Sequence, residues 1–344
     1  MAVSAASANI GRASDAASHD PHALMRIKNL QLRARAVVEG FYTGLHRSPF
    51  HGFSVEFSEY RPYTPGDDPR GLDWKLYARS DRYFIKRFED ETNRHVYLVL
   101  DRSRSMGFGT LEYDKSQYAV TLAATLAYFL TLQRDSVGLL TFDESVGEFV
   151  PARQRPGHFR QLMVALARPL AGSSTNLDVP LQQLAQLIAK RGLVILISDL
   201  LAPLQTLQRN LGLLRSRGHE VMILRTLDPG ELQLSLPGPT TVRDMETGRE
   251  LYLDPDAARE QYNQNFSAHR QQIRSICDSL GVDLYELPTD QPLADALLHV
   301  VSNQKQRSGR AGRRGMITRG AGGSRAGGTG GGAGRASGSQ GGAT

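Results

Sequence analysis

The chain of 344 residues contains one cysteine, Cys277, so it cannot form an internal disulfide and has no paired-cysteine motif for zinc or redox chemistry. No apolar stretch approaches the roughly 18 residues that a bilayer span requires. Residues 1–22 are rich in Ala and Ser but lack the apolar centre of a secretory signal. These absences predict a cytoplasmic protein without a membrane span.

Two common kinds of ligand-binding motif are also missing. There is no Gly-x-x-x-x-Gly-Lys loop, and Gly107-Phe108-Gly109 is followed by Glu112 where a dinucleotide fingerprint needs its third glycine. The nine histidines do not show the i, i+4 spacing of a helical metal site. Nucleotide binding of these kinds and a histidine-based metal centre are therefore disfavoured.

Positive charge is concentrated at one end of the chain. Residues 303–344 contain Lys305, seven arginines and no acidic residue, so this tail carries +8 of a total net charge of +6 and leaves −2 for the rest. Its Gly/Arg-rich composition cannot bury a core. We expect a disordered tail over 303–344 and a disordered extension over 1–22, with a nearly neutral folded part between them.

The folded part shows two patterns. Apolar positions at helical spacing predict a helix over 21–38, and residues 40–93, rich in aromatics, Gly, Pro and charge, predict short strands and turns. Residues 23–94 are thus expected to form an N-terminal segment that packs on the main domain. From His95 to residue 302, strand and helix patterns alternate, which predicts an α/β domain with a doubly wound, mostly parallel six-stranded sheet.

The expected elements of this domain follow from periodicity. The 193–198 segment has the continuous apolar character of a central parallel strand. Strands are expected over 95–100, 137–142, 147–152, 193–198, 220–226 and 282–287, helices over 115–132, 158–170, 177–191, 203–217 and 292–301, a long helix before residue 282, and hairpins at one edge of the sheet within 231–253.

Candidate metal ligands occur in three loops that follow core elements. The first loop contains Asp101, Ser103 and Ser105, the second Thr175, and the third Asp199. Loops at the carboxyl ends of parallel strands meet at one edge of the sheet. Two carboxylates and three hydroxyls are hard oxygen ligands that suit Mg²⁺ or Mn²⁺ rather than zinc, and they leave coordination positions to which a partner's carboxylate can bind.

The first loop has two other interpretations. Asp-x-Ser-x-Ser by itself is a common pattern and also fits an ordinary turn and helix cap, but its position within the alternating pattern favours a metal site. An Asp directly after the first strand is also typical of phosphatases of the haloacid dehalogenase type. Those enzymes need a second Asp two residues later, where this chain has Ser103, which disfavours the phosphatase-like alternative.

The three loops resemble the metal-ion-dependent adhesion site of von Willebrand factor type A domains. The matching residues are Asp101-x-Ser103-x-Ser105, Thr175-Asn176 and Ser198-Asp199, and the resemblance covers residues 95–302. It implies a von Willebrand factor A-like fold and a non-enzymatic role in binding proteins. The chain departs from the usual pattern at Arg102 and Arg104, where small or polar residues are more common; these arginines either favour an acidic partner or face solvent.

Upstream, a long motif reads Glu56-Phe57-x-x-Tyr60-Arg61-x-Tyr63-x-Pro65-Gly66-Asp67-Asp68-x-Arg70-x-x-Asp73-Trp74-x-x-Tyr77-Ala78-Arg79. This motif strongly resembles the domain-of-unknown-function family 58. The resemblance implies a bacterial adaptor or assembly factor that works with a MoxR-type AAA+ ATPase on an unknown client protein.

The charged residues of this motif have two interpretations, a partner surface and an internal ion-pair network. Because buried charges must be paired, the network is favoured, with Trp74 as a packing anchor. The residues concerned are Asp67, Asp68, Arg70, Asp73 and Arg79.

The basic tail allows a second function. Arg313-Arg314-Gly315 and Arg319-Gly320 resemble disordered RNA-binding segments, although no interleaved aromatics are present for stacking on bases. Nucleic-acid binding is therefore expected only through this tail, and a solubilising or partner-docking tail is favoured over specific RNA binding.

Overall fold

The computed structural model describes residues 20–47, 59–64, 72, 74–87, 94–169, 177–234, 238–244 and 248–302. The chain divides into two compact units, residues 1–299 and 300–344. The described elements lie almost entirely in the first unit. No helix in the described ranges is long and apolar enough to cross a membrane.

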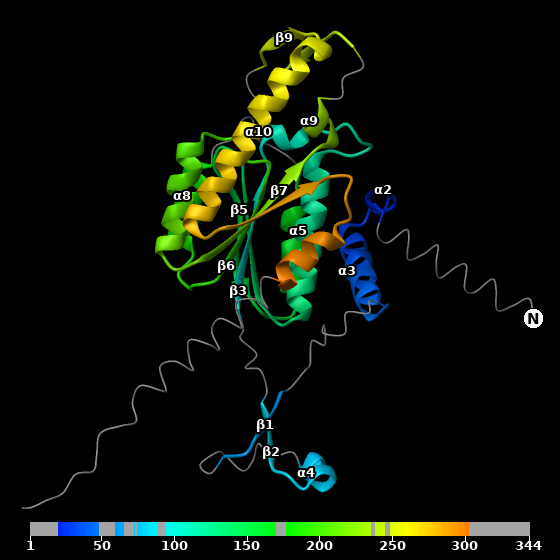
Figure 1. The fold of residues 1–344 in the computed structure, drawn as a ribbon, viewed down its shortest axis with the longest axis vertical. Coiled ribbons are helices and arrows are strands. Elements are labelled where there is room, and N and C mark those ends of the chain that lie inside the picture. Colours follow the sequence, from blue (N-terminus) through cyan, green and yellow to red (C-terminus); the bar gives the residue numbers. More distant parts are fainter. Residues whose placement is uncertain are drawn as a thin grey trace, which may run out of the picture. The chain divides into compact units, whose positions relative to one another are not determined.

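A six-stranded sheet forms the centre of the first unit, with the strand order β10-β7-β6-β3-β4-β5 (Figure 1). Neighbouring strands pair in parallel except β5, which runs antiparallel to β4 at one edge. This topology confirms the predicted doubly wound, mostly parallel sheet. The strands are β3 (His95–Asp101), β4 (Ser136–Phe142), β5 (Val146–Arg153), β6 (Leu193–Ser198), β7 (Glu220–Leu227) and β10 (Asp283–Pro288).

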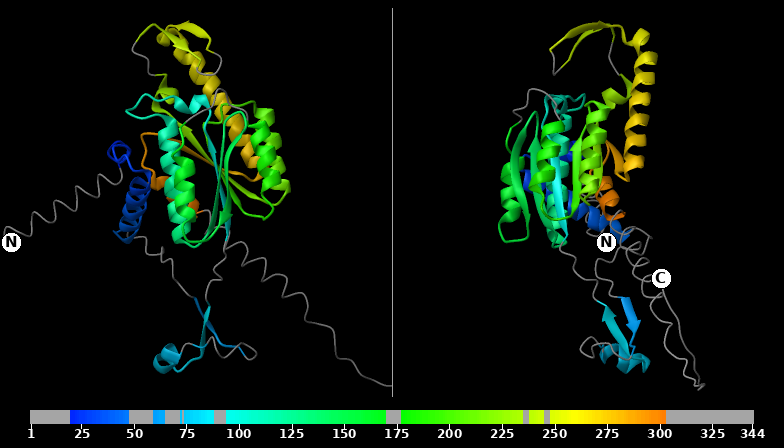
Figure 2. Two further views of the ribbon diagram at one scale, coloured as in Figure 1. Left: turned by 180° about the vertical axis from the view of Figure 1, so that it is seen from behind. Right: turned by 90° about the vertical axis from the view of Figure 1, so that its left-hand side faces the viewer.

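Helices cover both faces of the sheet, which explains why the central strands are apolar along their whole length (Figure 2). One face contacts α5 (Lys115–Leu132) and α6 (His158–Leu166). The other contacts α7 (Asp178–Leu187), α8 (Leu204–Ser216) and α10 (Pro255–Leu280). Side chains of β3 and β6 that point to this second face, including Tyr97, Val99, Val194 and Leu196, pack with Leu181, Leu207 and Ile273 from these three helices.

Helix α5 is buried on almost every side. The large apolar side chains of Tyr118, Leu122, Leu126 and Phe129 share one face and are fully buried, but Thr121 and Thr125 are fully buried as well. The reason is a second contact, because α3 (Leu30–Arg47) packs against α5. The Phe41 and Phe129 rings meet edge to face with centroids 5.8 Å apart.

The helix predicted over 21–38 is in fact two helices, α2 (Pro21–Met25) and α3, separated by residues 26–29. Arg33 stabilises the break. Its guanidinium donates hydrogen bonds to the carbonyls of Met25 and Ile27, which therefore need no helical partner, and, at 2.8 Å, to Thr121 Oγ1 in α5. Asn29 Oδ1 accepts a hydrogen bond from Leu32 N at the start of α3. Helix α3 also continues to Arg47, through residues predicted to be irregular.

The region predicted to contain only short strands and turns also includes a helix. Strand β1 (Glu59–Pro62) pairs antiparallel with β2 (Phe84–Arg87), and α4 (Trp74–Ser80) lies between them in the sequence. The Tyr77 and Tyr83 rings stack with centroids 4.5 Å apart.

Of the hairpins predicted within 231–253, the described residues of this range form one. Strands β8 (Thr240–Arg243) and β9 (Glu250–Leu253) form their own two-stranded sheet rather than extending the central one. Before them, α9 (Pro229–Gln233) is a short helix that begins directly after β7. A last helix covers 294–302.

Candidate functional site

The loops after β3 and β6 meet at the carboxyl edge of the sheet because these two strands are hydrogen-bonded neighbours. Ser198 Oγ donates to Asp101 Oδ2 at 2.6 Å, and Ser103 N donates to Asp101 Oδ1 at 2.9 Å. The hydroxyls of Ser103 and Ser105 lie 3.1 Å apart. Asp101, Ser103 and Ser198 are fully buried and Ser105 nearly so.

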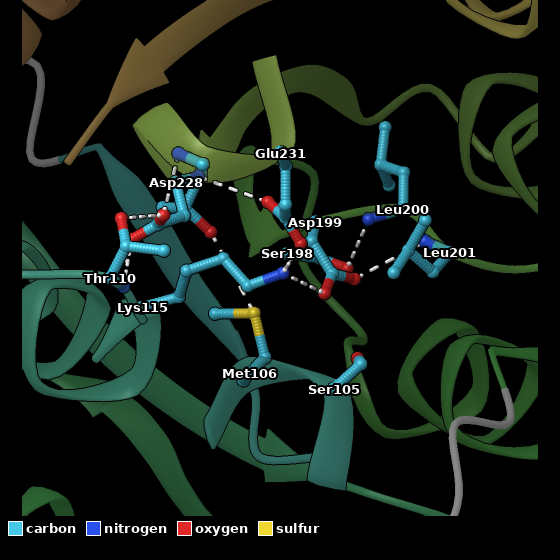
Figure 3. Close-up of polar contacts among 12 residues, drawn as sticks. Ser105, Met106, Thr110, Lys115, Ser198, Asp199, Leu200, Leu201, Asp228 and Glu231 are labelled. Carbon is cyan, nitrogen blue, oxygen red and sulfur yellow. Dashed lines mark hydrogen bonds and ion pairs between the residues drawn. The ribbon is translucent and has the colours of Figure 1, made fainter. Parts of the chain in front are cut away.

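Lys115 is a member of this site that sequence reasoning missed. Its Nζ lies 2.8 Å from Asp199 Oδ2 and 2.5 Å from Glu231 Oε1, and the lysine side chain is fully buried. Figure 3 shows the ammonium group pointing between the two carboxylates. One signal was available, because Lys115 opens a helix whose first turn has no acidic residue. A cation is unfavourable at that end of the helix dipole, so it needs carboxylate partners.

The segment directly after β7 supplies Glu231, the second carboxylate that contacts Lys115. Glu231 Oε2 accepts a hydrogen bond from Asp228 N at 3.0 Å, which completes the capping box at the start of α9. Asp228 in turn accepts from Thr110 N at 3.0 Å and from Thr110 Oγ1 at 2.5 Å. The polar network thus links the loops after β3, β6 and β7 (Figure 3).

The electrostatics of the site follow from burial and from its two neighbouring carboxylates. Burial, and after it the charge of Asp199, raises the pKa of Asp101 to about 7. The hydrogen bonds from Ser198 and Ser103 act in the opposite direction but are outweighed. Burial alone would lower the pKa of Lys115, but Asp199 and Glu231 outweigh it and raise that pKa above its usual value. Lys115 contacts Asp199 and Glu231, whereas the described residues that donate hydrogen bonds to Asp101 are neutral.

Most of the predicted metal ligands therefore lie close together. Asp101, Ser103 and Ser105 form one group, and Asp199 follows Ser198, which is bonded to Asp101. Thr175 lies outside the described residues. Within the described part, no group of three or more His, Cys, Asp or Glu side chains has a geometry that could hold a metal. A cation here would consequently need the serine hydroxyls as well as the carboxylates.

The donor set fits a hard divalent cation. Carboxylate and hydroxyl oxygens are the ligands that Mg²⁺ and Mn²⁺ prefer. Asp101, Asp199 and Glu231 together with Lys115 carry a formal charge of −2 when all four are ionised, and a divalent cation would balance this charge. The chemistry of the residues present is thus compatible with the predicted metal.

The two arginines of the first loop behave differently. Arg104 is exposed, whereas Arg102 is only 8% exposed and points into the protein, where its guanidinium donates to the carbonyls of Leu166 and Arg168. The prediction of a solvent-facing side chain is therefore wrong for Arg102, whereas the alternative of an acidic partner stays a prediction. Of the residues predicted as a partner surface, Arg79 is exposed at the end of α4, and the other four, Asp67, Asp68, Arg70 and Asp73, lie outside the described residues.

The strand order and the polar site at the carboxyl edge define a von Willebrand factor A-like α/β domain. The chain belongs to the family described as "Protein of unknown function DUF58", whose pattern matches residues 59–272. An uncharacterized protein of Mycobacterium tuberculosis is 30% identical over 292 residues, covering 83% of this chain and 91% of the relative. The uncharacterized protein YeaD of Bacillus subtilis is 27% identical over 121 residues, covering 35% and 28%.

Solved structures give weaker similarities. An aerotolerance-related membrane protein from Bacteroides fragilis has a TM-score of 0.43 and 14% identity, with coverage of 61% of this chain and 99% of that one. BatB from Bacteroides thetaiotaomicron has a TM-score of 0.42 and 16% identity, with coverage of 62% and 99%.

Proposed function

We propose that the protein is a non-enzymatic adaptor that holds Mg²⁺ or Mn²⁺ at Asp101, Ser103 and Ser105, with Thr175 and Asp199, and binds an acidic segment of another protein there. One observation supports this proposal most strongly. Asp101 and the Ser103–Ser105 hydroxyl pair lie together at the carboxyl edge of the sheet, next to Asp199. When bound, the metal would supply a coordination position for a partner's carboxylate.

The chain's own residues prepare the donors for this role. The Ser103 amide and the Ser198 hydroxyl each hold one oxygen of Asp101, so the orientation of the carboxylate is set before any ligand arrives. Leu201 N donates to Asp199 Oδ1 at 3.2 Å and Lys115 to its other oxygen, which fixes this carboxylate as well. Such second contacts orient metal ligands and tune their affinity.

A binding role is favoured over catalysis by the partners of the serines. The Ser103 hydroxyl pairs with the Ser105 hydroxyl, and the Ser198 hydroxyl donates to Asp101. A serine nucleophile needs an adjacent general base that is itself oriented by a third group. The family resemblance extends the proposal to a MoxR-type AAA+ ATPase as one partner, an unknown client as the other, and action in the cytoplasm.

Metal binding is tested by calorimetric titration of Mg²⁺ and Mn²⁺ into the wild type, Asp101→Asn and Asp143→Asn. Asp143 is a half-buried carboxylate directly after β4, and its Oδ1 accepts a hydrogen bond from Ser145 N rather than from a proposed metal ligand, so it serves as the matched control. We expect saturable binding to the wild type and Asp143→Asn and its loss in Asp101→Asn. Equal affinities in all three proteins would remove the metal site from the proposal.

Partner binding is tested by a pull-down with a MoxR-type ATPase from the same bacterium, with Mg²⁺ or with EDTA. Binding in Mg²⁺ that is lost both in EDTA and in Asp101→Asn supports a metal-bridged contact. Binding that persists in EDTA would instead show a surface that does not depend on the metal.

A further inference from the structure

A second polar site lies beside the first loop, in a cavity of about 470 Å³. Its walls come from the α2–α3 connection, the first turns of α5 and the end of α6, so segments far apart in sequence line it. Four lining side chains are cationic, namely Lys28, Arg33, Arg102 and Arg168, and one, Asp114, is a carboxylate. If all are ionised, the lining has a formal charge of +3.

Three of the four cations, Arg33, Lys28 and Arg102, have no ion pair with a described residue. Arg33 donates to the carbonyls of Met25 and Ile27 and to Thr121 Oγ1, all of which are neutral acceptors. Lys28 is exposed and has no ion pair with a described residue. Arg168 forms a surface ion pair with Glu148. The positive charge of the cavity is therefore only partly balanced.

Arg102 is the most constrained member of this group. Its two terminal nitrogens donate to the carbonyls of Leu166 and Arg168, and its Nε is buried without a hydrogen-bond partner in the described part of the chain. Burial lowers the pKa of Arg102, and the charge of Asp114 partly opposes this effect. Asp114 Oδ1 already accepts from Gln117 N at 2.7 Å as the N-cap of α5. A buried guanidinium without an ion pair is unfavourable, and an acceptor supplied by a ligand would improve its environment.

We propose that this cavity binds the phosphate group of a small organic phosphate, with Arg102 and Lys28 as the principal contacts. Arginine guanidinium groups match the geometry of phosphate oxygens, and hydrogen bonds between two charged groups are the strong ones. The net positive lining suits a dianion better than a neutral ligand. This proposal does not depend on the metal site.

The volume favours an organic phosphate over inorganic phosphate. Small-molecule sites have volumes of about 300–1,000 Å³ and combine apolar walls with a few polar groups. Leu30, Val120 and Leu166 contribute apolar wall next to the cations, so the rest of the ligand could pack there. An acidic peptide is the competing occupant, and the experiment below includes it.

The experiment titrates three probes, inorganic phosphate, AMP and a tetraglutamate peptide, into the full chain by calorimetry. EDTA is present throughout, so that no phosphate can bind through a metal and failure of the metal site cannot affect the result. The variants are Arg102→Gln, Lys28→Gln and the matched control Arg104→Gln, which removes an exposed arginine two residues away, outside the cavity. Circular dichroism checks that each variant is folded.

We expect AMP to bind more tightly than inorganic phosphate. Arg102→Gln should weaken AMP binding by about ten- to one-hundredfold, as expected for the loss of a charged hydrogen bond, and Lys28→Gln should weaken it less. Arg104→Gln should leave it unchanged. Because Lys28 is exposed, its variant remains informative even if Arg102→Gln does not fold.

Three results would overturn the proposal. The first is that AMP does not bind to the folded wild type. The second is that the wild type, Lys28→Gln and Arg102→Gln bind AMP with equal affinity. The third is that the tetraglutamate peptide binds more tightly than AMP. Equal affinity for phosphate and AMP would also refute the part of the proposal that assigns an organic ligand.

Discussion

Replacing the buried cation of the site tests how its charges are balanced. Lys115→Met keeps an unbranched side chain of similar length but removes the ammonium group that lies 2.8 Å from Asp199 and 2.5 Å from Glu231. Asp199, whose side chain is 1% exposed, cannot then be hydrated, whereas Glu231, at 18%, can be in part. The variant leaves at least one buried carboxylate without a charged partner.

The expected cost is large for a single substitution. Removing one member of a buried ion pair costs about 3–5 kcal/mol, because the remaining charge stays buried and unpaired. A domain of ordinary stability unfolds with about 5–15 kcal/mol, so the variant should lose a substantial part of its stability. Adding Asp199→Asn to Lys115→Met should restore some of the loss, because the double variant no longer buries that unpaired charge.

Urea denaturation followed by circular dichroism measures these differences, with EDTA present so that metal binding does not contribute. Lys190→Met is the control, because Lys190 is exposed, and it should change the free energy of unfolding by less than about 0.5 kcal/mol. The reasoning is refuted if the free energies of unfolding of Lys115→Met and the wild type differ by less than about 1 kcal/mol. It is also refuted if the double variant is less stable than Lys115→Met.

Three further predictions concern the scaffold. Burial raises the pKa of Asp135 to about 6, so the folded protein binds this proton more tightly than the unfolded chain, and stability should fall as pH rises from about 4 to about 6. Asp135→Asn should remove this pH dependence and should be more stable than the wild type by about 1 kcal/mol at pH 7. If urea denaturation shows the same pH dependence for the wild type and the variant, the prediction is wrong. Gly192→Ala should destabilise the protein by about 1–3 kcal/mol, because a Cβ would lie 2.2 Å from the His95 carbonyl oxygen. Gly212→Ala in α8 should stabilise the protein by about 0.5–1 kcal/mol, because no atom outside the helix backbone lies closer than 4.0 Å to the new Cβ. Thermal denaturation should therefore rank Gly212→Ala above Gly192→Ala, and the opposite order would show the reasoning to be wrong.

Helix α5 shows how far periodicity alone could go. Its bounds were predicted correctly at both ends, because the apolar spacing and the N-cap Asp114 are local features. Its burial on almost every side was not predicted, since that depends on α3 packing against it. The break between α2 and α3 was missed for the same reason, because Arg33 reaches Thr121, which is 88 residues away in sequence.

The sequence by itself determined the alternation of strands and helices, and with it the edge of the sheet at which Asp101, Ser103 and Asp199 are placed. That much follows from local patterns, since side-chain periodicity defines the elements and parallel strands bring their carboxyl ends together. Only the tertiary structure decided the charge balance of the site. Lys115 meets carboxylates 84 and 116 residues away, and Arg102 turns inward while Arg104 does not. Electrostatic energy depends on which distant groups are buried together, and no local pattern contains that information.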